Sequence, residues 1–182
     1  MPNWCDNYVT ITGPSDAINE LWYKSKETII VEGNEQERGF LNTLRPQPEF
    51  DKAKPDNSLM PDWWTWRVNN WGTKWDVDPS DLVLEDNGDT STISGYIESA
   101  WSPPVEAFND LVSNNPDVSV EMHYHEPGMA FVGVAQSDSG AMVDSSYEYS
   151  DMESLDYIPE DVVEYWDLRN YLEDILEEEV DI

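Results

Sequence analysis

The sequence contains little cysteine and few basic residues. Its one cysteine, Cys5, excludes an internal disulfide and a cysteine-based zinc site, as expected for a protein of a reducing cytoplasm. Nine lysines and arginines stand against 39 aspartates and glutamates, which gives a formal net charge of −30 at pH 7. Such a charge repels nucleic acids and anionic membranes and attracts basic protein surfaces. We therefore expect no direct binding to nucleic acid or to a membrane.

Long apolar runs and known catalytic motifs are absent as well. No run approaches the roughly 18 apolar residues of a membrane span, and the first residues lack the basic and apolar regions of a signal peptide. The chain has no glycine-rich phosphate loop, nucleophile elbow or kinase motif. We expect a non-enzymatic cytoplasmic protein without a cofactor.

Tryptophan, in contrast, is abundant. Five of the nine tryptophans lie within residues 63–75, and each can bury roughly 150 to 250 Å². Trp63, Trp66 and Trp71 recur at near-helical spacing, which predicts a helix over residues 62–72 that packs into the core.

The remaining patterns predict one α+β domain over residues 1–146, a mainly antiparallel sheet with helices on one face. Further helices are predicted over residues 15–26 and from a Ser102 cap to Asn114. An insertion is predicted around residues 49–76, with residues 49–61 on the surface. Strands are predicted over residues 5–12, 40–44, 81–85, 91–99, 118–124, 129–136 and 141–149.

Residues 147–182 form an acidic C-terminal segment that we predict to be helical. Its apolar residues recur at three- and four-residue spacing, and most carboxylates lie opposite them. Like charges at this spacing destabilise an isolated helix, so the apolar stripe must dock on the sheet or on a partner. The stripe consists of Val162, Tyr165, Leu168, Leu172 and Ile175.

Acidic charge is concentrated in the second part of the chain. Residues 1–74 carry 8 basic and 11 acidic residues, whereas residues 75–182 carry 1 and 28. A protein that is acidic for solubility, or for life in high salt, should be acidic over its whole surface. The uneven distribution favours a specific electrostatic use, with simple solvation as the alternative.

Four motifs occur in the order Met1–Asn7 (MPNWCDN), Leu44–Pro48 (LRPQP), Trp66–Asp76 (WRVNNWGTKWD) and Ala100–Pro104 (AWSPP). With them the chain resembles the YubB-type ferredoxin-like domain family of plasmids and bacteriophages, over roughly residues 1–140. The resemblance implies a ferredoxin-like sandwich and a mobile-element origin, and it brings no activity, catalytic residue or cofactor. The chain departs from the family after about Tyr147, in its acidic segment.

Aromatic and amide side chains around the tryptophan stretch suggest a small-ligand pocket. The alternative is that they hydrogen-bond irregular backbone beside the core. The candidate pocket residues are Trp4, Asn7, Asn70, Trp71, Lys74 and Trp101.

Three other patterns have both a chemical and a structural interpretation. Cys5 is either a thiol nucleophile or a small buried hydrophobic residue. The side chains of Glu121, His123 and His125, which share one face of a strand, form either a set of zinc ligands or an ordinary polar face. One cluster of carboxylates is either a Ca²⁺ or Mg²⁺ site or part of a solvated loop. It consists of Asp76, Asp78, Asp81, Glu85, Asp86 and Asp89.

We expect the acidic segment to imitate nucleic acid and to bind a basic nucleic-acid-binding protein of a bacterial host. One alternative is an assembly protein, with possible homo-oligomers, that docks through Leu168, Leu172 and Ile175. Another is a metal-dependent enzyme built on residues 71–89. The predicted partner-binding residues are Glu160, Asp161, Glu164, Asp167, Glu173, Asp174, Glu177 and Glu178.

Overall fold

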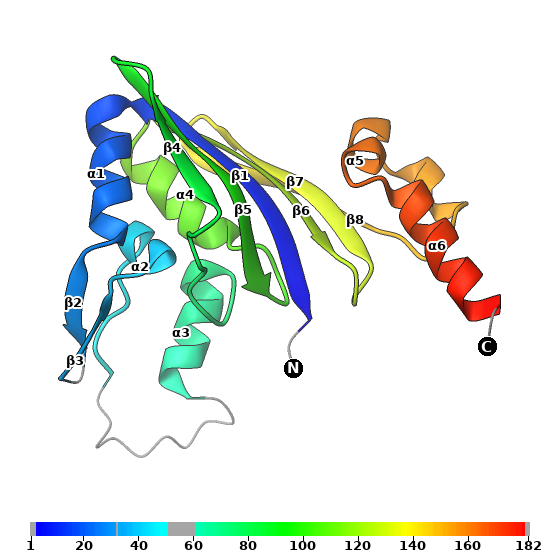
Figure 1. Ribbon diagram of the computed structural model, residues 1–182, viewed down its shortest axis with the longest axis horizontal. Coiled ribbons are helices and arrows are strands. Elements are labelled where there is room, and N and C mark those ends of the chain that lie inside the picture. Colours follow the sequence, from blue (N-terminus) through cyan, green and yellow to red (C-terminus); the bar gives the residue numbers. More distant parts are fainter. Residues whose placement is uncertain (1–2, 32, 51–60, 181–182) are drawn as a thin grey trace.

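The computed structural model describes residues 3–31, 33–50 and 61–180. Its centre is a six-stranded antiparallel sheet with the strand order β4-β5-β1-β6-β7-β8 (Figure 1). The strands are β1 (Trp4–Pro14), β4 (Leu82–Asp86), β5 (Thr90–Ala100), β6 (Ser119–Glu126), β7 (Phe131–Asp138) and β8 (Ala141–Glu148).

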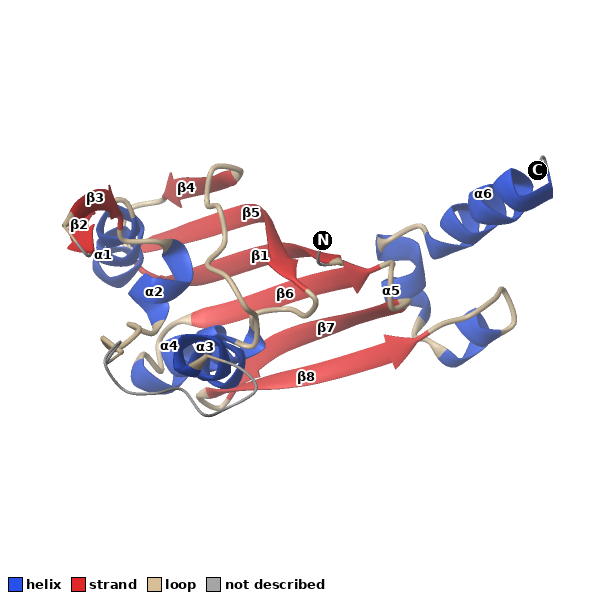
Figure 2. Ribbon diagram, turned by 90° about the horizontal axis from the view of Figure 1, so that it is seen from below, coloured by secondary structure: helices blue, strands red, loops and turns tan. Residues whose placement is uncertain are grey.

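Four helices cover one face of the sheet, which we call the inner face (Figure 2). They are α1 (Ser15–Ser25), α2 (Phe40–Leu44), α3 (Asp62–Trp71) and α4 (Val105–Asn114). Along β1, the inward residues Cys5, Val9 and Ile11 are fully buried and alternate with partly exposed ones, because successive side chains of a strand point to opposite faces. This alternation was visible in the sequence.

The elements β1, α1, β4, β5, α4 and β6 follow one another in the β-α-β-β-α-β order of a ferredoxin-like sandwich. The predicted fold class is therefore confirmed. Strands β7 and β8 widen this sheet beyond β6. A separate hairpin of β2 (Thr28–Val31) and β3 (Asn34–Glu37) follows α1 and was not predicted.

The tryptophan helix is confirmed as α3, and it ends at Gly72 in the left-handed conformation, with φ 85°. Trp71 is 1% exposed and belongs to the core. Residues 51–60 of the predicted insertion lie outside the described residues. In the part of the chain that is described, no helix is long and apolar enough to cross a bilayer.

The prediction of a strand over Phe40–Leu44 is wrong, because these residues form helix α2. The Asp76 carboxylate accepts hydrogen bonds from the backbone N–H groups of Leu41 (2.7 Å) and Asn42 (3.1 Å). These are N–H groups of the first helical turn, which lack partners within the helix. Gly39 precedes them with φ 92°, and a Cβ there would collide with Asp76.

The C-terminal segment consists of three short helices instead of a continuous one. They are the 3-10 helix η1 (Ser154–Tyr157), α5 (Glu160–Tyr165) and α6 (Leu168–Val180). The helical conformation is interrupted at Asp167, between α5 and α6. Its φ of 49° is left-handed, a conformation that aspartate tolerates better than most residues. Figure 2 shows α5 at one end of the sheet and α6 extending beyond that end.

These helices pack on the outer face of the sheet, opposite α1 to α4. Val132 of β7, Val163 of α5 and Leu168 of α6 are each at most 1% exposed and belong to one apolar cluster. This second core is separate from the cluster on the inner face. The apolar stripe predicted for the segment thus docks on the sheet of its own chain.

Candidate functional site

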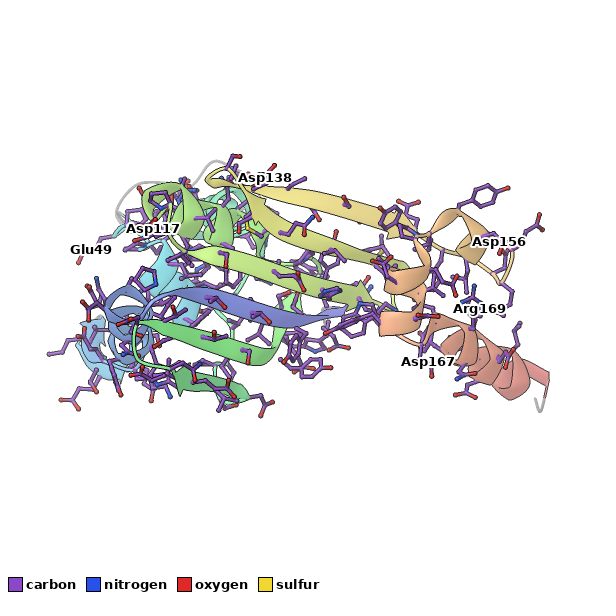
Figure 3. All side chains as sticks on the ribbon, turned by 90° about the horizontal axis from the view of Figure 1, so that it is seen from above. Glu49, Asp117, Asp138, Asp156, Asp167 and Arg169 are labelled. Carbon is purple, nitrogen blue, oxygen red and sulfur yellow. The ribbon has the colours of Figure 1, made fainter. Side chains whose placement is uncertain are left out.

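Six exposed carboxylates on α5, on α6 and at the break between them form what we call the C-terminal acidic surface. All six were predicted as partner-binding residues. The side chains of Glu177 and Glu178, predicted with them, lie outside the described residues. Figure 3 shows Asp167 at this end of the molecule, with Asp117 and Asp138 at the far end of the sheet. The surface consists of Glu160, Asp161, Glu164, Asp167, Glu173 and Asp174.

Packing on the sheet holds the backbone of this surface in place. Val162 and Val163, which lie between the exposed carboxylates of α5, are 4% and 1% exposed. Beside them the Tyr165 ring stacks on His123 of β6, with centroids 4.0 Å apart and an interplanar angle of 9°. The carboxylates of α5 therefore project from a docked helix and not from a free tail.

One internal ion pair reduces the charge of the acidic surface. Arg169, the only basic residue after Lys74, donates to both carboxylate oxygens of Glu160, at 2.7 and 2.9 Å. Hydrogen bonding to Arg169 lowers the pKa of Glu160. Among the described residues, no ion pair involves the other five carboxylates. Those five are therefore available to an external cation.

Beneath α5 and α6 lies His125, which the sequence suggested as a metal ligand. Its Nε2 is 2.7 Å from the Tyr149 hydroxyl, and its ring contacts those of Trp166 and Tyr171, with centroids 5.5 and 5.3 Å away. Burial lowers the pKa of His125 to about 4. His123 shares the outer face as predicted, but its Nε2 lies 3.1 Å from Glu121.

No group of three histidine, cysteine or acidic side chains in the described ranges is arranged to hold a metal ion. In the loop suggested as a cation site, Asp76 instead binds the N-terminus of α2. Asp86 accepts from the backbone N–H of Gly88 and from the Asn19 amide, which fixes the β4–β5 turn. Asp78 accepts from the backbone N–H of Ser80 at 2.9 Å. Three of the six candidate ligands are therefore used in hydrogen bonds that hold the backbone.

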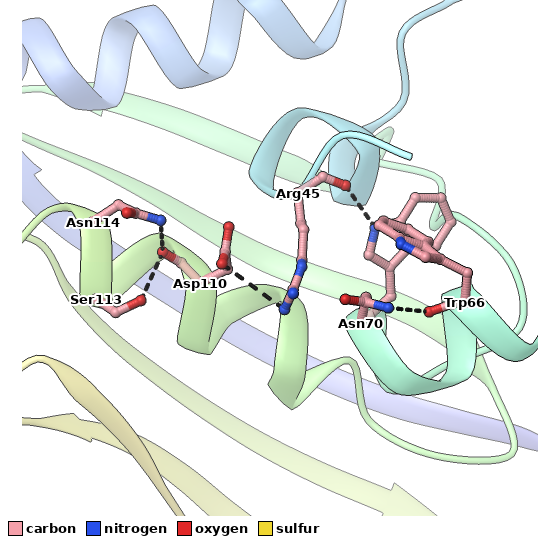
Figure 4. Close-up of polar contacts among 7 residues, drawn as sticks. Arg45, Trp66, Asn70, Asp110, Ser113 and Asn114 are labelled. Carbon is pink, nitrogen blue, oxygen red and sulfur yellow. Dashed lines mark hydrogen bonds and ion pairs between the residues drawn. The ribbon is translucent and has the colours of Figure 1, made fainter. Parts of the chain in front are cut away.

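The structure separates the six residues suggested as a small-ligand pocket. Asn7 is fully buried, and its amide donates to the backbone oxygens of Cys5 (2.8 Å) and Ile97 (3.1 Å). The indole of Trp71 donates to the Arg45 carbonyl at 2.8 Å. Asn70 donates to the Trp66 carbonyl at 2.7 Å (Figure 4). These three side chains support backbone beside the core. Cys5 is buried as well, and burial raises its pKa.

The other three residues gather around a tryptophan that the sequence did not single out as a site residue. The Trp75 ring lies 6.0 Å from Trp4 and 6.5 Å from Trp101, and it stacks on Trp101 at an interplanar angle of 26°. The Lys74 ammonium lies 4.5 Å from the Trp75 ring centroid and 5.1 Å from that of Trp101. Trp4 and Trp101 are 45% and 40% exposed, so this aromatic cluster reaches the surface.

Beside the aromatic cluster lies a cleft of about 260 Å³. Its sheet side is formed by Trp4 of β1 and by Tyr96 and Glu98 of β5, and its other side by the loop over residues 76–81. We call it the Trp4 cleft. Only Trp4 among its residues belonged to the predicted pocket, because the cleft combines segments far apart in the sequence.

Residues 71–169 match the family model described as "Ferredoxin-like domain in Api92-like protein", which is more than half of the chain and runs into α6. A crystal structure of a protein api92 from Yersinia pseudotuberculosis is similar, with 12% sequence identity and a TM-score of 0.49. That match covers 82% of this chain and 99% of the api92 chain. A comparison with curated proteins found no match. The chain therefore belongs to the family that carries the ferredoxin-like domain of Api92-like proteins.

Proposed function

We propose that this protein is a non-enzymatic accessory protein of a phage or plasmid that blocks a basic nucleic-acid-binding protein of its bacterial host. It acts in the host cytoplasm, where its C-terminal acidic surface occupies the site that nucleic acid phosphates would otherwise hold. Charge attraction at long range speeds the encounter, and salt weakens the complex. A defence nuclease is the natural class of target.

The observation that carries this proposal is the set of unpaired carboxylates on docked helices. Five of the six described carboxylates have no ion-pair partner among the described residues. Positions three or four residues apart on one helix surface lie about 5 to 6 Å apart, so Asp161 and Glu164 of α5 present two charges at a spacing that coarsely imitates one charged strand. Because the backbone beneath them is packed, less ordering entropy is lost on binding.

The assembly alternative uses the apolar stripe instead of the charges. Leu168 and Leu172 are 0% and 8% exposed and already pack in the second core. Within the stripe, Tyr165 and Ile175 are exposed, at 40% and 37%, and offer area to another protein. The stripe is thus largely used within the chain, which favours the charged residues as the partner surface.

The proposal is tested with a variant in which four carboxylates of the acidic surface are neutralised. Tagged wild-type protein and the variant are incubated with bacterial lysate at low ionic strength, and retained proteins are eluted with salt or with competing duplex DNA. We expect the wild type to retain a nucleic-acid-binding protein that DNA displaces, and the variant to lose it. The substitutions are Asp161→Asn, Glu164→Gln, Glu173→Gln and Asp174→Asn.

A matched control carries the same change in charge elsewhere on the molecule. All four control residues are exposed and lie outside the C-terminal segment. This control should retain the partner as the wild type does. Equal retention by both variants would contradict the proposal, as would a partner that neither salt nor DNA releases. The control substitutions are Glu20→Gln, Glu106→Gln, Asp117→Asn and Asp138→Asn.

A further inference from the structure

We propose that the Trp4 cleft binds an organic cation, a guanidinium or alkylammonium group held between aromatic rings and carboxylates. This site is separate from the C-terminal acidic surface and goes beyond the blocking function proposed above. Its ligand is either a free small cation or a lysine or arginine side chain of another protein.

The cleft exists because β4 is shorter than β5. The pairing of these strands runs from Asp86↔Ser91 to Leu82↔Gly95, so β5 continues from Tyr96 without a neighbouring strand on that side. At Ala100 the Thr73 side chain takes the place of that strand, binding both the backbone N–H and the carbonyl at 3.0 Å. Between these two points the loop over residues 76–81 faces the sheet across the cleft.

The lining combines the two kinds of group that bind organic cations. Trp4 and Tyr96 are 45% and 52% exposed, so their rings are accessible to a ligand. Asp78, Asp81 and Glu98 are exposed carboxylates around the same space. An aromatic ring attracts a cation through its quadrupole, and a carboxylate attracts it through charge. In the ranges that the structure describes, no lysine or arginine forms an ion pair with these three carboxylates.

A second observation is independent of the carboxylates. The aromatic cluster next to the cleft already holds a cation of its own chain, because the Lys74 ammonium lies against the rings of Trp75 and Trp101. Trp4 lies against Trp75, with ring centroids 6.0 Å apart, and it also lines the cleft. The cleft of about 260 Å³ is smaller than typical drug-sized sites, and this size suits a single side chain or small amine.

The test follows the Trp4 indole N–H signal in NMR spectra of the intact protein during titration with N-acetylarginine amide. The matched probe is N-acetylcitrulline amide, which has a similar shape without the charge. We expect a saturable shift with the arginine compound and none with the citrulline compound. Glu98→Gln should weaken the binding about tenfold, the loss expected for one partly desolvated charge contact. Glu106→Gln, the same change in charge on the opposite face, should leave it unchanged.

Two further titrations identify the source of the cation. Tighter binding of an arginine-containing peptide than of the free amide supports a protein side chain, and tighter binding of putrescine supports a free polyamine. Equal shifts with the arginine and citrulline probes would overturn the site, as would the absence of saturation while the spectrum shows a folded protein. Because no host partner is used, failure here leaves the proposed function standing, and failure of the lysate experiment leaves this site standing.

Discussion

His125 links the docking of the C-terminal helices to pH. The side chain is 7% exposed and lies among Tyr149, Trp166 and Tyr171. Burial lowers its pKa to about 4, whereas an unfolded chain has a histidine pKa near 6.5. Since the folded-state pKa is the lower one, the unfolded state binds the proton more tightly. The free energy of unfolding therefore falls as the pH drops from about 6.5 toward 4.

Replacing His125 with phenylalanine should remove this dependence. Phenylalanine keeps an aromatic ring in the same contacts but cannot take up a proton. We expect the wild type to lose about 2 kcal/mol relative to His125→Phe between pH 7 and pH 5, given the two pKa values above. The measurement is urea unfolding of both proteins at each pH. The carboxylates common to both proteins titrate alike, so their contribution cancels in the difference between the two free energies of unfolding. A difference that does not change with pH would contradict the prediction.

Docking of α5 and α6 depends on a few apolar side chains, and Leu168 lies at their centre. It is fully buried in the cluster shared by β7, α5 and α6. Leu168→Ala removes buried apolar volume and leaves a cavity, which costs about 2 to 5 kcal/mol in comparable cores. We expect a lower free energy of unfolding in urea, together with faster amide hydrogen exchange in α5 and α6.

Leu176 of the same helix provides the matched control. It is 54% exposed, so Leu176→Ala makes the same chemical change at a position that packs against little. Its effect should stay within about 0.5 kcal/mol. Similar losses from the two substitutions would show that α6 is not docked as described.

Elements with a local signal could be predicted, and those set by distant contacts could not. The alternation in β1 and the spacing of tryptophans in α3 specify those elements within their own residues. Helix α2 has five residues and depends on a carboxylate 35 residues away, at Asp76. The helical spacing of the apolar residues predicted helix in α6, but that spacing carries no sign of the interruption before it, at Asp167, where φ is 49°.

The same distinction applies to the candidate sites. Exposure of the carboxylates on α5 and α6 follows from helical spacing, which is why the acidic surface could be predicted from the sequence. The Trp4 cleft joins β1, the free half of β5 and the 76–81 loop, so its residues have no common spacing. Asn7 and Trp71 resembled ligand groups in the sequence, but each donates to backbone carbonyls far along the chain.

At the scale of the whole molecule, the uneven charge acts against folding. Residues 75–182 carry 28 acidic residues and one basic residue, and the folded chain brings them closer together than the unfolded chain does. Such self-repulsion destabilises the compact state. The Debye length, over which charges still interact, is about 30 Å at 0.01 M salt and about 3 Å at 1 M. Added salt therefore suppresses most of the repulsion.

We therefore expect sodium chloride to stabilise this protein, raising the free energy of unfolding in urea by on the order of 1 kcal/mol between 0.01 M and 0.5 M. A protein held together by surface ion pairs would respond in the opposite direction. The variant that neutralises four carboxylates of the C-terminal acidic surface should respond less to salt than the control neutralised at Glu20, Glu106, Asp117 and Asp138. The reason is the density of negative charge, since residues 148–181 hold 14 of the 39 acidic residues. Equal salt responses in the two variants would mean that the repulsion is spread over the whole surface, and the acidic surface would then lose its special status as a site of concentrated charge.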